Sequence, residues 1–223
     1  MPAASSPVNC MKLEGLRNLY RGHRPGSVYK RQNFSVLVPF FEKDGELYLL
    51  YEKRSATMET QPGDTCFPGG HVEKGETPMM CAVRETEEEI GIPQGNIEII
   101  SQGDTMYGAA GFSLYSFIGV LRPEDVDRIR LQEEEVDEVF YIPVKELLEV
   151  RPQIYTQRMK PLIPADFPYE RIGITKDYPW RVGTYEIPVY EIGDRVIWGM
   201  TAKITEGVLE NIRAYIDRTC GNA

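Results

Sequence analysis

The segment from Thr77 to Pro93 constrains the fold more than any other part of the sequence, because it carries both ends of one helix. Threonine can cap the free N–H groups of a helix start, and proline suits the first helical position, so Thr77-Pro78 predicts the beginning. Gly91 suits a left-handed cap at the end. At about 100° per residue, four side chains share a narrow arc that we expect to pack on a sheet: Met79, Val83, Thr86 and Ile90.

The same helix carries Glu85, Glu88 and Glu89 at spacings that bring their carboxylates together. Each like-charged pair costs about 0.2–0.5 kcal/mol on an exposed helix, so a counter-charge is expected. Carboxylate oxygens bind hard cations, and the predicted cofactor is therefore Mg²⁺ or Mn²⁺. Taken alone, an acidic run is equally typical of a helix face that is simply solvated.

A cation of the chain itself is placed to brace this cluster. Arg84 precedes Glu88 by one helical turn, so the two side chains can meet. Glu76, in the loop before the helix, is expected to pair with Arg84 and to fix its orientation. Glu87 points away from the other three glutamates.

Short apolar runs elsewhere predict the strands of a sheet and the remaining helices. The strands are expected at 35–41, 46–51, 97–101, 113–121, 139–142 and 196–202, and the helices at 11–22, 143–148 and 205–216. Residues 52–77 form a long loop rich in Gly and Pro, which in a domain of this size is usually functional. Residues 151–183 contain several prolines and no periodicity, and are expected to be an irregular insertion. This order of elements predicts an α+β fold, an α/β/α sandwich with a mixed β-sheet packed between helices.

Charge and cysteine content narrow the function classes. A net charge of −9 argues against nucleic acid as a partner, while a small phosphorylated ligand would need local Arg or Lys side chains or a metal. The four cysteines form no CxxC pair and only two histidines exist, so a structural zinc site is not expected. No signal peptide or membrane-spanning run is recognised, which predicts a cytoplasmic protein with free thiols and no membrane partner.

The segment from Gly70 to Ile92 resembles the Nudix box, G-x5-E-x7-R-E-U-x-E-E-x-G-U, where U is a bulky aliphatic residue. All seven fixed letters match, and Thr86 at the first U position is the one soft departure. The resemblance implies a Nudix fold and a hydrolase that cleaves a diphosphate linkage with a divalent metal. It divides the chain into an N-terminal tail and helix, residues 1–30, and a Nudix domain, residues 31–223, that holds the insertion.

The resemblance also implies roles for individual residues. The implied metal ligands are Gly70, through its carbonyl, Glu85, Glu88 and Glu89. Arg84 and Glu76 would be the bracing pair. One glutamate would act as general base: Glu88 or Glu89 is the first candidate, and Glu135, in a loop that commonly faces this helix in the family, is the second. An ordinary loop acid is the alternative for Glu135.

The loop before the box is similar to the signature of coenzyme A diphosphatases, L-L-T-x-R-S/A-x3-R-x3-G-x3-F-P-G-G. Arg54, Ser55, Gly63 and the Phe-Pro-Gly-Gly end match, so Arg54, Phe67 and Gly69 become the candidate substrate contacts. Tyr51, Glu52 and Glu59 depart from it, because the signature has Leu, Thr and Arg there. The implied reaction splits coenzyme A into 3′,5′-ADP and 4′-phosphopantetheine.

Two further stretches and two alternatives stay open. Residues 196–202 are similar to the Ile-Trp-Gly-Leu-Thr-Ala run of the same subfamily, and equally fit a plain core strand. The aromatic insertion at 151–183 fits a cap over the site, a stack for adenine, a buried flap or the surface of a homodimer. Because Glu59 replaces an Arg, ADP-ribose, NADH and dinucleoside polyphosphates are alternative substrates. A Nudix-fold binding module that catalyses no reaction is the last alternative. Such modules usually lack one of the box glutamates, whereas this chain keeps Glu85, Glu88 and Glu89.

Overall fold

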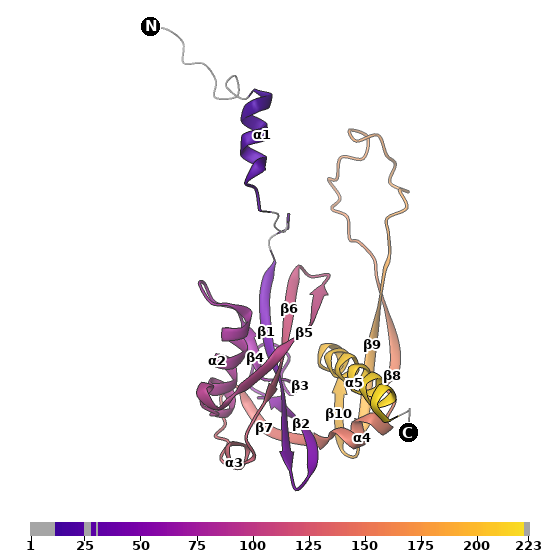
Figure 1. The fold of residues 1–223 in the computed structure, drawn as a ribbon. Helices are drawn as coiled ribbons and strands as arrows, with labels where there is room; N and C mark the ends of the chain where they lie inside the picture. The colour runs from indigo at the N-terminus through magenta and orange to yellow at the C-terminus, as the bar shows by residue number, and fades with distance from the viewer. Residues whose placement is uncertain (1–11, 25–27, 30, 221–223) are drawn as a thin grey trace. The chain divides into compact units, whose positions relative to one another are not determined.

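The computed structural model describes residues 12–24, 28–29 and 31–220 (Figure 1). The chain divides into two units, Met1–Arg31 and Gln32–Ala223. In the first unit, α1 (Leu13–Arg21) is the helix predicted near the N-terminus, and none of its residues is buried. The predicted tail over residues 1–10 lies outside the described residues.

The second unit is built on a mixed sheet. Its strands are β1 (Gln32–Lys43), β2 (Glu46–Arg54), β3 (Thr65–Cys66), β4 (Gly69–His71), β5 (Glu98–Gly108), β6 (Phe112–Val120) and β7 (Val136–Pro143). They follow the order β3-β2-β1-β6-β5, with β4 paired to β1 and β7 to β2. β1 and β6 run parallel, whereas β1 is antiparallel to β2 and β4. The predicted strands of this region are all present, and the short β3 and β4 are additions.

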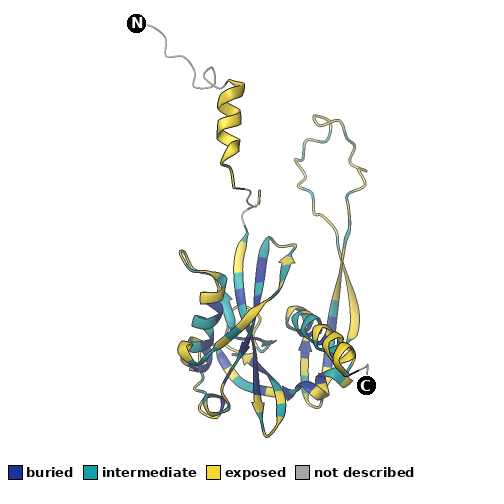
Figure 2. Cartoon of the chain, viewed as in Figure 1, coloured by how far each residue is buried: buried dark blue, intermediate teal, exposed yellow. Residues whose placement is uncertain are grey.

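Helices cover both faces of this sheet. They are α2 (Pro78–Ile90), the 3₁₀ turn η2 (Gln94–Asn96), α3 (Pro123–Val126), α4 (Val144–Glu149) and α5 (Gly199–Cys220). Side chains alternate along β1, so Leu37 and Phe41 join the core beneath α2, while Val38 and Phe40 join the core beneath α5. Both sets are buried, which is why β1 is dark blue along much of its length (Figure 2). The predicted α/β/α sandwich is confirmed.

A second sheet was not predicted. Its strands, in the order β10-β9-β8, are β8 (Gln153–Met159), β9 (Gly183–Ile192) and β10 (Arg195–Trp198). The prediction of an irregular segment at 151–183 is therefore wrong for residues 153–159. β8 shows no apolar alternation because all but one of its residues are exposed, and its stability comes from pairing with β9.

The predicted strand at 196–202 is also wrong in its second half. The strand ends at Trp198, and the chain turns at Gly199, whose φ of 65 suits glycine, into the helix α5. Apolar residues of the run therefore belong to two elements. Ile197 is buried from the strand and Ala202 from the first turns of the helix.

The segment that connects β8 and β9 carries a small aromatic cluster. Phe167 lies 5.0 Å from Tyr169 and 5.6 Å from Trp180, and Tyr178 lies 5.0 Å from Trp180, each measured between ring centroids. All three pairs are edge-to-face, the favoured geometry for such rings. None of residues 151–183 is buried, so the predicted buried flap is wrong. A cap over the site, a stack for adenine and the surface of a homodimer stay predictions for this segment. Within the described residues, no helix is long and apolar enough to cross a bilayer.

Candidate active site

The helix α2 begins and ends at the residues that the sequence predicts. Thr77 Oγ1 accepts a hydrogen bond from the Met80 N–H at 3.2 Å. Gly91 adopts a left-handed φ of 72, and its N–H donates to the Glu87 carbonyl at 3.0 Å. Both ends are therefore capped, which fixes where the helix that carries the glutamates begins and ends.

The face that α2 turns to the sheet differs from the predicted arc. Its buried residues are Cys81, Ala82, Thr86, Glu89 and Ile90. Met79, predicted to pack, is 45% exposed. The reason is that Glu89 points inward, where its Oε2 accepts a hydrogen bond from the Gly69 N–H at 2.8 Å. A carboxylate, which an apolar pattern cannot predict, thus occupies part of the packing face.

Arg84 joins three glutamates. Its Nε and Nη2 donate to the two oxygens of Glu76 at 2.9 and 3.2 Å. Its Nη2 also lies 2.9 Å from Glu85 Oε1, and its Nη1 donates to Glu88 Oε2 at 2.8 Å. The hydrogen bonds from Arg84 lower the pKa of Glu76, which keeps this bracing group ionised.

Glycines of β4 let the backbone approach this cluster closely. A Cβ at Gly70 would lie 2.3 Å from Glu85 Oε1, and a Cβ at Gly69 would lie 2.7 Å from the Val36 Cα. The first clash would displace a carboxylate and the second would separate β4 from β1. The Gly70 carbonyl accepts a hydrogen bond from the Cys81 thiol at 3.6 Å. Both glycines are therefore needed for the arrangement of the cluster.

A buried carboxylate that sequence reasoning did not place in the site, Glu52, belongs to the same cluster. Glu52 is 1% exposed and Glu89 is 2% exposed. Burial raises the pKa of Glu52, and it also raises the pKa of Glu89, where the charge of Glu52 adds to the effect. Strand alternation could have placed Glu52 in the site from the sequence. Tyr48, Leu50 and Glu52 are two residues apart, so they lie on the same face of β2, which α2 covers.

Glu135 is close enough to act on these groups electrostatically. Its backbone carbonyl accepts a hydrogen bond from the Ser55 N–H at 2.8 Å. Its negative charge contributes to raising the pKa of Glu52, Glu85 and Glu89. The loop before β7 therefore faces the α2 cluster, and the acid in it remains a candidate base.

The remaining predicted residues surround the cluster to different degrees. The side chain of Glu88 is 51% exposed and Arg84 is its partner. Arg54 donates from Nε to the Thr60 carbonyl at 3.4 Å, and its positive charge offsets part of the rise that burial causes in the pKa of Glu52. Phe67 is 2% exposed and stacks on Tyr51, so it supports the loop from inside the core rather than from the site surface.

The donor atoms of the cluster fit a hard divalent cation. They are carboxylate and carbonyl oxygens. The thiols of Cys66 and Cys81 touch two of them, but burial raises the pKa of both thiols, so neither is a thiolate ligand of the kind that zinc favours. Among the residues that the structure describes, no three His, Cys, Asp or Glu side chains stand in metal-binding geometry. Arg84 holds Glu85 and Glu88, but the buried Glu52 Oε2 has no hydrogen-bond partner. Such an orphaned oxygen beside further carboxylates is a position where a cation offsets unfavourable charge.

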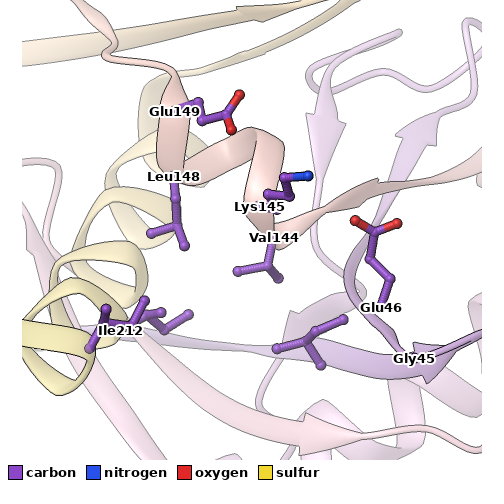
Figure 3. A pocket seen from close by; sticks show the side chains of 9 residues that line it. Gly45, Glu46, Val144, Lys145, Leu148, Glu149 and Ile212 are labelled. Atoms are coloured by element: carbon purple, nitrogen blue, oxygen red, sulfur yellow. The ribbon is translucent and has the colours of Figure 1, made fainter. Parts of the chain in front are cut away.

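A separate open hollow of about 530 Å³ lies on the opposite side of the sheet (Figure 3). It is bounded by the β1–β2 turn, α4 and the end of α5, with Val144, Leu148 and Ile212 as apolar lining. None of the predicted site residues lines it. The predicted site residues therefore lie away from this hollow.

Comparisons with known proteins agree with the sequence motifs. The family described as the NUDIX domain matches residues 31–165. The human mitochondrial coenzyme A diphosphatase NUDT8 is 29% identical over 207 residues, which are 91% of this chain and 80% of that protein. Nudix hydrolase 3 of Caenorhabditis elegans is 34% identical over 59% of this chain, and the mouse peroxisomal coenzyme A diphosphatase NUDT7 is 32% identical over 56%. The chain spans only 56% and 52% of the length of these last two proteins.

Proposed function

Because this chain belongs to the Nudix hydrolase family, we propose that it is a divalent-metal-dependent diphosphatase that splits coenzyme A, or a derivative, into 3′,5′-ADP and 4′-phosphopantetheine. The observation that carries the proposal is the α2 cluster, in which Glu85 and Glu89 lie beside the glycine backbone of β4 and Glu88 is joined to Glu85 through Arg84. The choice of substrate is supported by similarity to relatives named coenzyme A diphosphatases, one of them over 91% of this chain.

Each member of the cluster has a proposed role. Glu85, Glu88, Glu89 and the Gly70 carbonyl would hold Mg²⁺ or Mn²⁺. Bound there, a divalent cation neutralises phosphate charge and lowers the pKa of a coordinated water. Arg84, held by Glu76, would keep Glu85 and Glu88 oriented. Such outer positioning commonly contributes a factor of about 10–100 in metal affinity or activity.

A general base must accept a proton from the attacking water. Glu88 is half exposed and reaches solvent, so a water molecule can approach it. Glu89 is enclosed and already accepts a hydrogen bond from Gly69, and Glu135 faces the cluster from the loop before β7. Of the two first candidates, Glu88 and Glu89, we therefore favour Glu88, and Glu135 stays the second candidate.

Substrate recognition would come from the loop before the box. Arg54 would meet a phosphate of the nucleotide, because it stands at the end of β2, where this loop begins, and its guanidinium charge acts on Glu52 of the cluster. The Gly69 backbone lies at the cluster, and Phe67 would position it from the core. Glu59 stands where the signature has a second Arg, which is the specific reason to keep ADP-ribose, NADH and dinucleoside polyphosphates as alternative substrates.

A substrate panel with and without metal tests this proposal. The protein is incubated with coenzyme A, ADP-ribose, NADH and diadenosine tetraphosphate in Mg²⁺ or Mn²⁺, and the products are separated by chromatography. Coenzyme A is expected to give 3′,5′-ADP, and EDTA is expected to abolish its formation until metal is restored. Preferential cleavage of another compound of the panel would show that this compound, and not coenzyme A, is the substrate. Undiminished turnover in EDTA would overturn the proposed metal dependence.

Replacing Arg84 by Lys should weaken Mn²⁺ binding and lower turnover by about 10–100-fold. One ammonium group cannot keep a two-pronged contact with Glu76 while also meeting Glu85 and Glu88. Arg195→Lys is the matched control, because Arg195 makes a similar fork on Glu138, at 2.8 and 2.7 Å, outside the cluster. Equal effects of the two substitutions on turnover would remove the positioning role of Arg84.

Three further properties belong to the proposal. The first 30 residues would form a separate tail and helix, and residues 31–223 the catalytic domain, with the hairpin of β8 and β9 as its elaboration. The cellular location would be the cytoplasm, which fluorescence microscopy of the tagged full chain tests.

The possible homodimer is tested by light scattering, which measures the mass of the full chain in solution. None of these enters the chemistry proposed for α2.

A further inference from the structure

The position of Glu52 within β2 determines where its carboxylate lies. In β2, Glu52 pairs with Cys66 of β3 on one side and with Val139 of β7 on the other, so its backbone is fixed between two strands. Its side chain follows Tyr48 and Leu50 on the sheet face covered by α2. The side chain of Glu89 reaches the space between this sheet face and α2 from the helix, and it accepts a hydrogen bond from the Gly69 N–H there.

The two oxygens of Glu52 have different surroundings. Oε1 accepts a hydrogen bond from the Cys66 thiol at 3.2 Å. Oε2 is enclosed and has no hydrogen-bond partner among the described residues. The residue is 1% exposed, so bulk solvent does not reach this atom either. An unpaired carboxylate oxygen inside a protein is costly, and a thiol is a weak donor that offsets little of that cost.

The charges around Glu52 make this cost larger. Glu85, Glu89 and Glu135 all interact with it repulsively, and Arg54 is the cation that acts on it. Like-charged carboxylates gathered in a poorly solvated layer strongly favour the uptake of a cation. The unpaired Oε2 and the surrounding carboxylates therefore point to the same missing partner.

We propose that Glu52 Oε2 is an additional ligand of the divalent cation held by the α2 cluster. The inference rests on the proposed function, which assigns a cation to that cluster, and extends it to a residue outside the box. The coenzyme A diphosphatase signature has Thr at this position, so Glu52 would give this chain one more anionic ligand than that signature provides. An added carboxylate raises affinity for a hard divalent cation.

Mn²⁺ binding to the full chain without substrate tests the proposal, with electron paramagnetic resonance to count free Mn²⁺. Glu52→Gln is expected to lower the affinity at least ten-fold, and Glu52→Asp, which keeps the charge but shortens the side chain, by a smaller factor. Glu46→Gln is the matched control, because it removes the same charge from the same strand at the far end. An affinity of Glu52→Gln within two-fold of the wild type overturns the proposal.

Thermal unfolding separates this role from a merely structural one. In EDTA, Glu52→Gln is expected to melt at the same temperature as the wild type or higher, because repulsion with Glu89 is relieved. Its gain in melting temperature on adding Mn²⁺ is expected to be smaller. A lower melting temperature in EDTA together with an unchanged gain from Mn²⁺ would show that Glu52 only supports the fold, and would overturn the proposal.

Three further outcomes are distinguished. If Glu52→Gln does not fold, Glu52→Asp alone is titrated, and an unchanged affinity overturns the proposal while at least a three-fold loss supports it. If the wild-type chain binds no Mn²⁺, both the ligand role of Glu52 and the metal dependence in the proposed function fail. If the wild type and Glu52→Gln bind Mn²⁺ equally, only the role of Glu52 fails.

Discussion

Replacing Glu85 by Gln is expected to lower turnover of coenzyme A by about 10²–10³-fold, the order of magnitude lost when one group that stabilises transition-state charge is removed. The Glu85 carboxylate lies against Gly70 and forms an ion pair with Arg84. It therefore stands where α2, β4 and the bracing pair of Arg84 and Glu76 meet. Glutamine has the same shape but binds a divalent cation poorly. The measurement is initial rate in saturating Mg²⁺, together with Mn²⁺ affinity.

The matched control for this substitution is Glu87→Gln, which makes the same chemical change two residues along the same helix. Glu87 accepts a hydrogen bond from Gln94 Nε2 at 2.7 Å and is not part of the cluster. Its replacement is expected to change turnover less than two-fold. A Glu85→Gln variant as active as the Glu87→Gln variant would remove Glu85 from the metal site.

Replacing Tyr51 by Ala should lower the free energy of unfolding by about 3–5 kcal/mol, as for other large aromatic residues in cores. Tyr51 is fully buried and stacks on Phe67 and Phe140, with ring centroids 4.9 and 5.6 Å away. Its hydroxyl is 3.1 Å from Thr205 Oγ1 of α5. The substitution therefore leaves a cavity and also a buried hydroxyl without its partner.

Urea unfolding followed by circular dichroism measures this effect. Tyr215→Ala is the control, because Tyr215 lies on the same helix as Thr205 but is 62% exposed, and its loss should cost less than about 0.5 kcal/mol. A destabilisation below 1 kcal/mol for Tyr51→Ala would show that the aromatic stack relaxes around the missing ring. Since Phe67 precedes the β4 glycines, reduced turnover is expected to accompany the destabilisation.

The main sheet and the helices next to it were predicted because local signals decide them. Leu37, Val38, Phe40 and Phe41 are apolar because β1 is buried on both faces, and that burial leaves a continuous apolar run in the sequence. Thr77 and Gly91 cap α2 through contacts within a few residues, so they too can be read locally. By contrast, β8 is exposed and pairs with the distant β9, and no local pattern records that pairing.

For the site, the sequence alone determined the spacing of Glu85, Glu88 and Glu89 and their common helix, since helical geometry converts spacing into proximity. Only the tertiary structure decided that Glu89 turns into the sheet and that Glu52, from a strand 37 positions earlier in the chain, lies in the same buried layer. The physical reason is that the environment of a carboxylate depends on which distant strand α2 packs against. That environment, and not the spacing, determines which oxygens lack a partner.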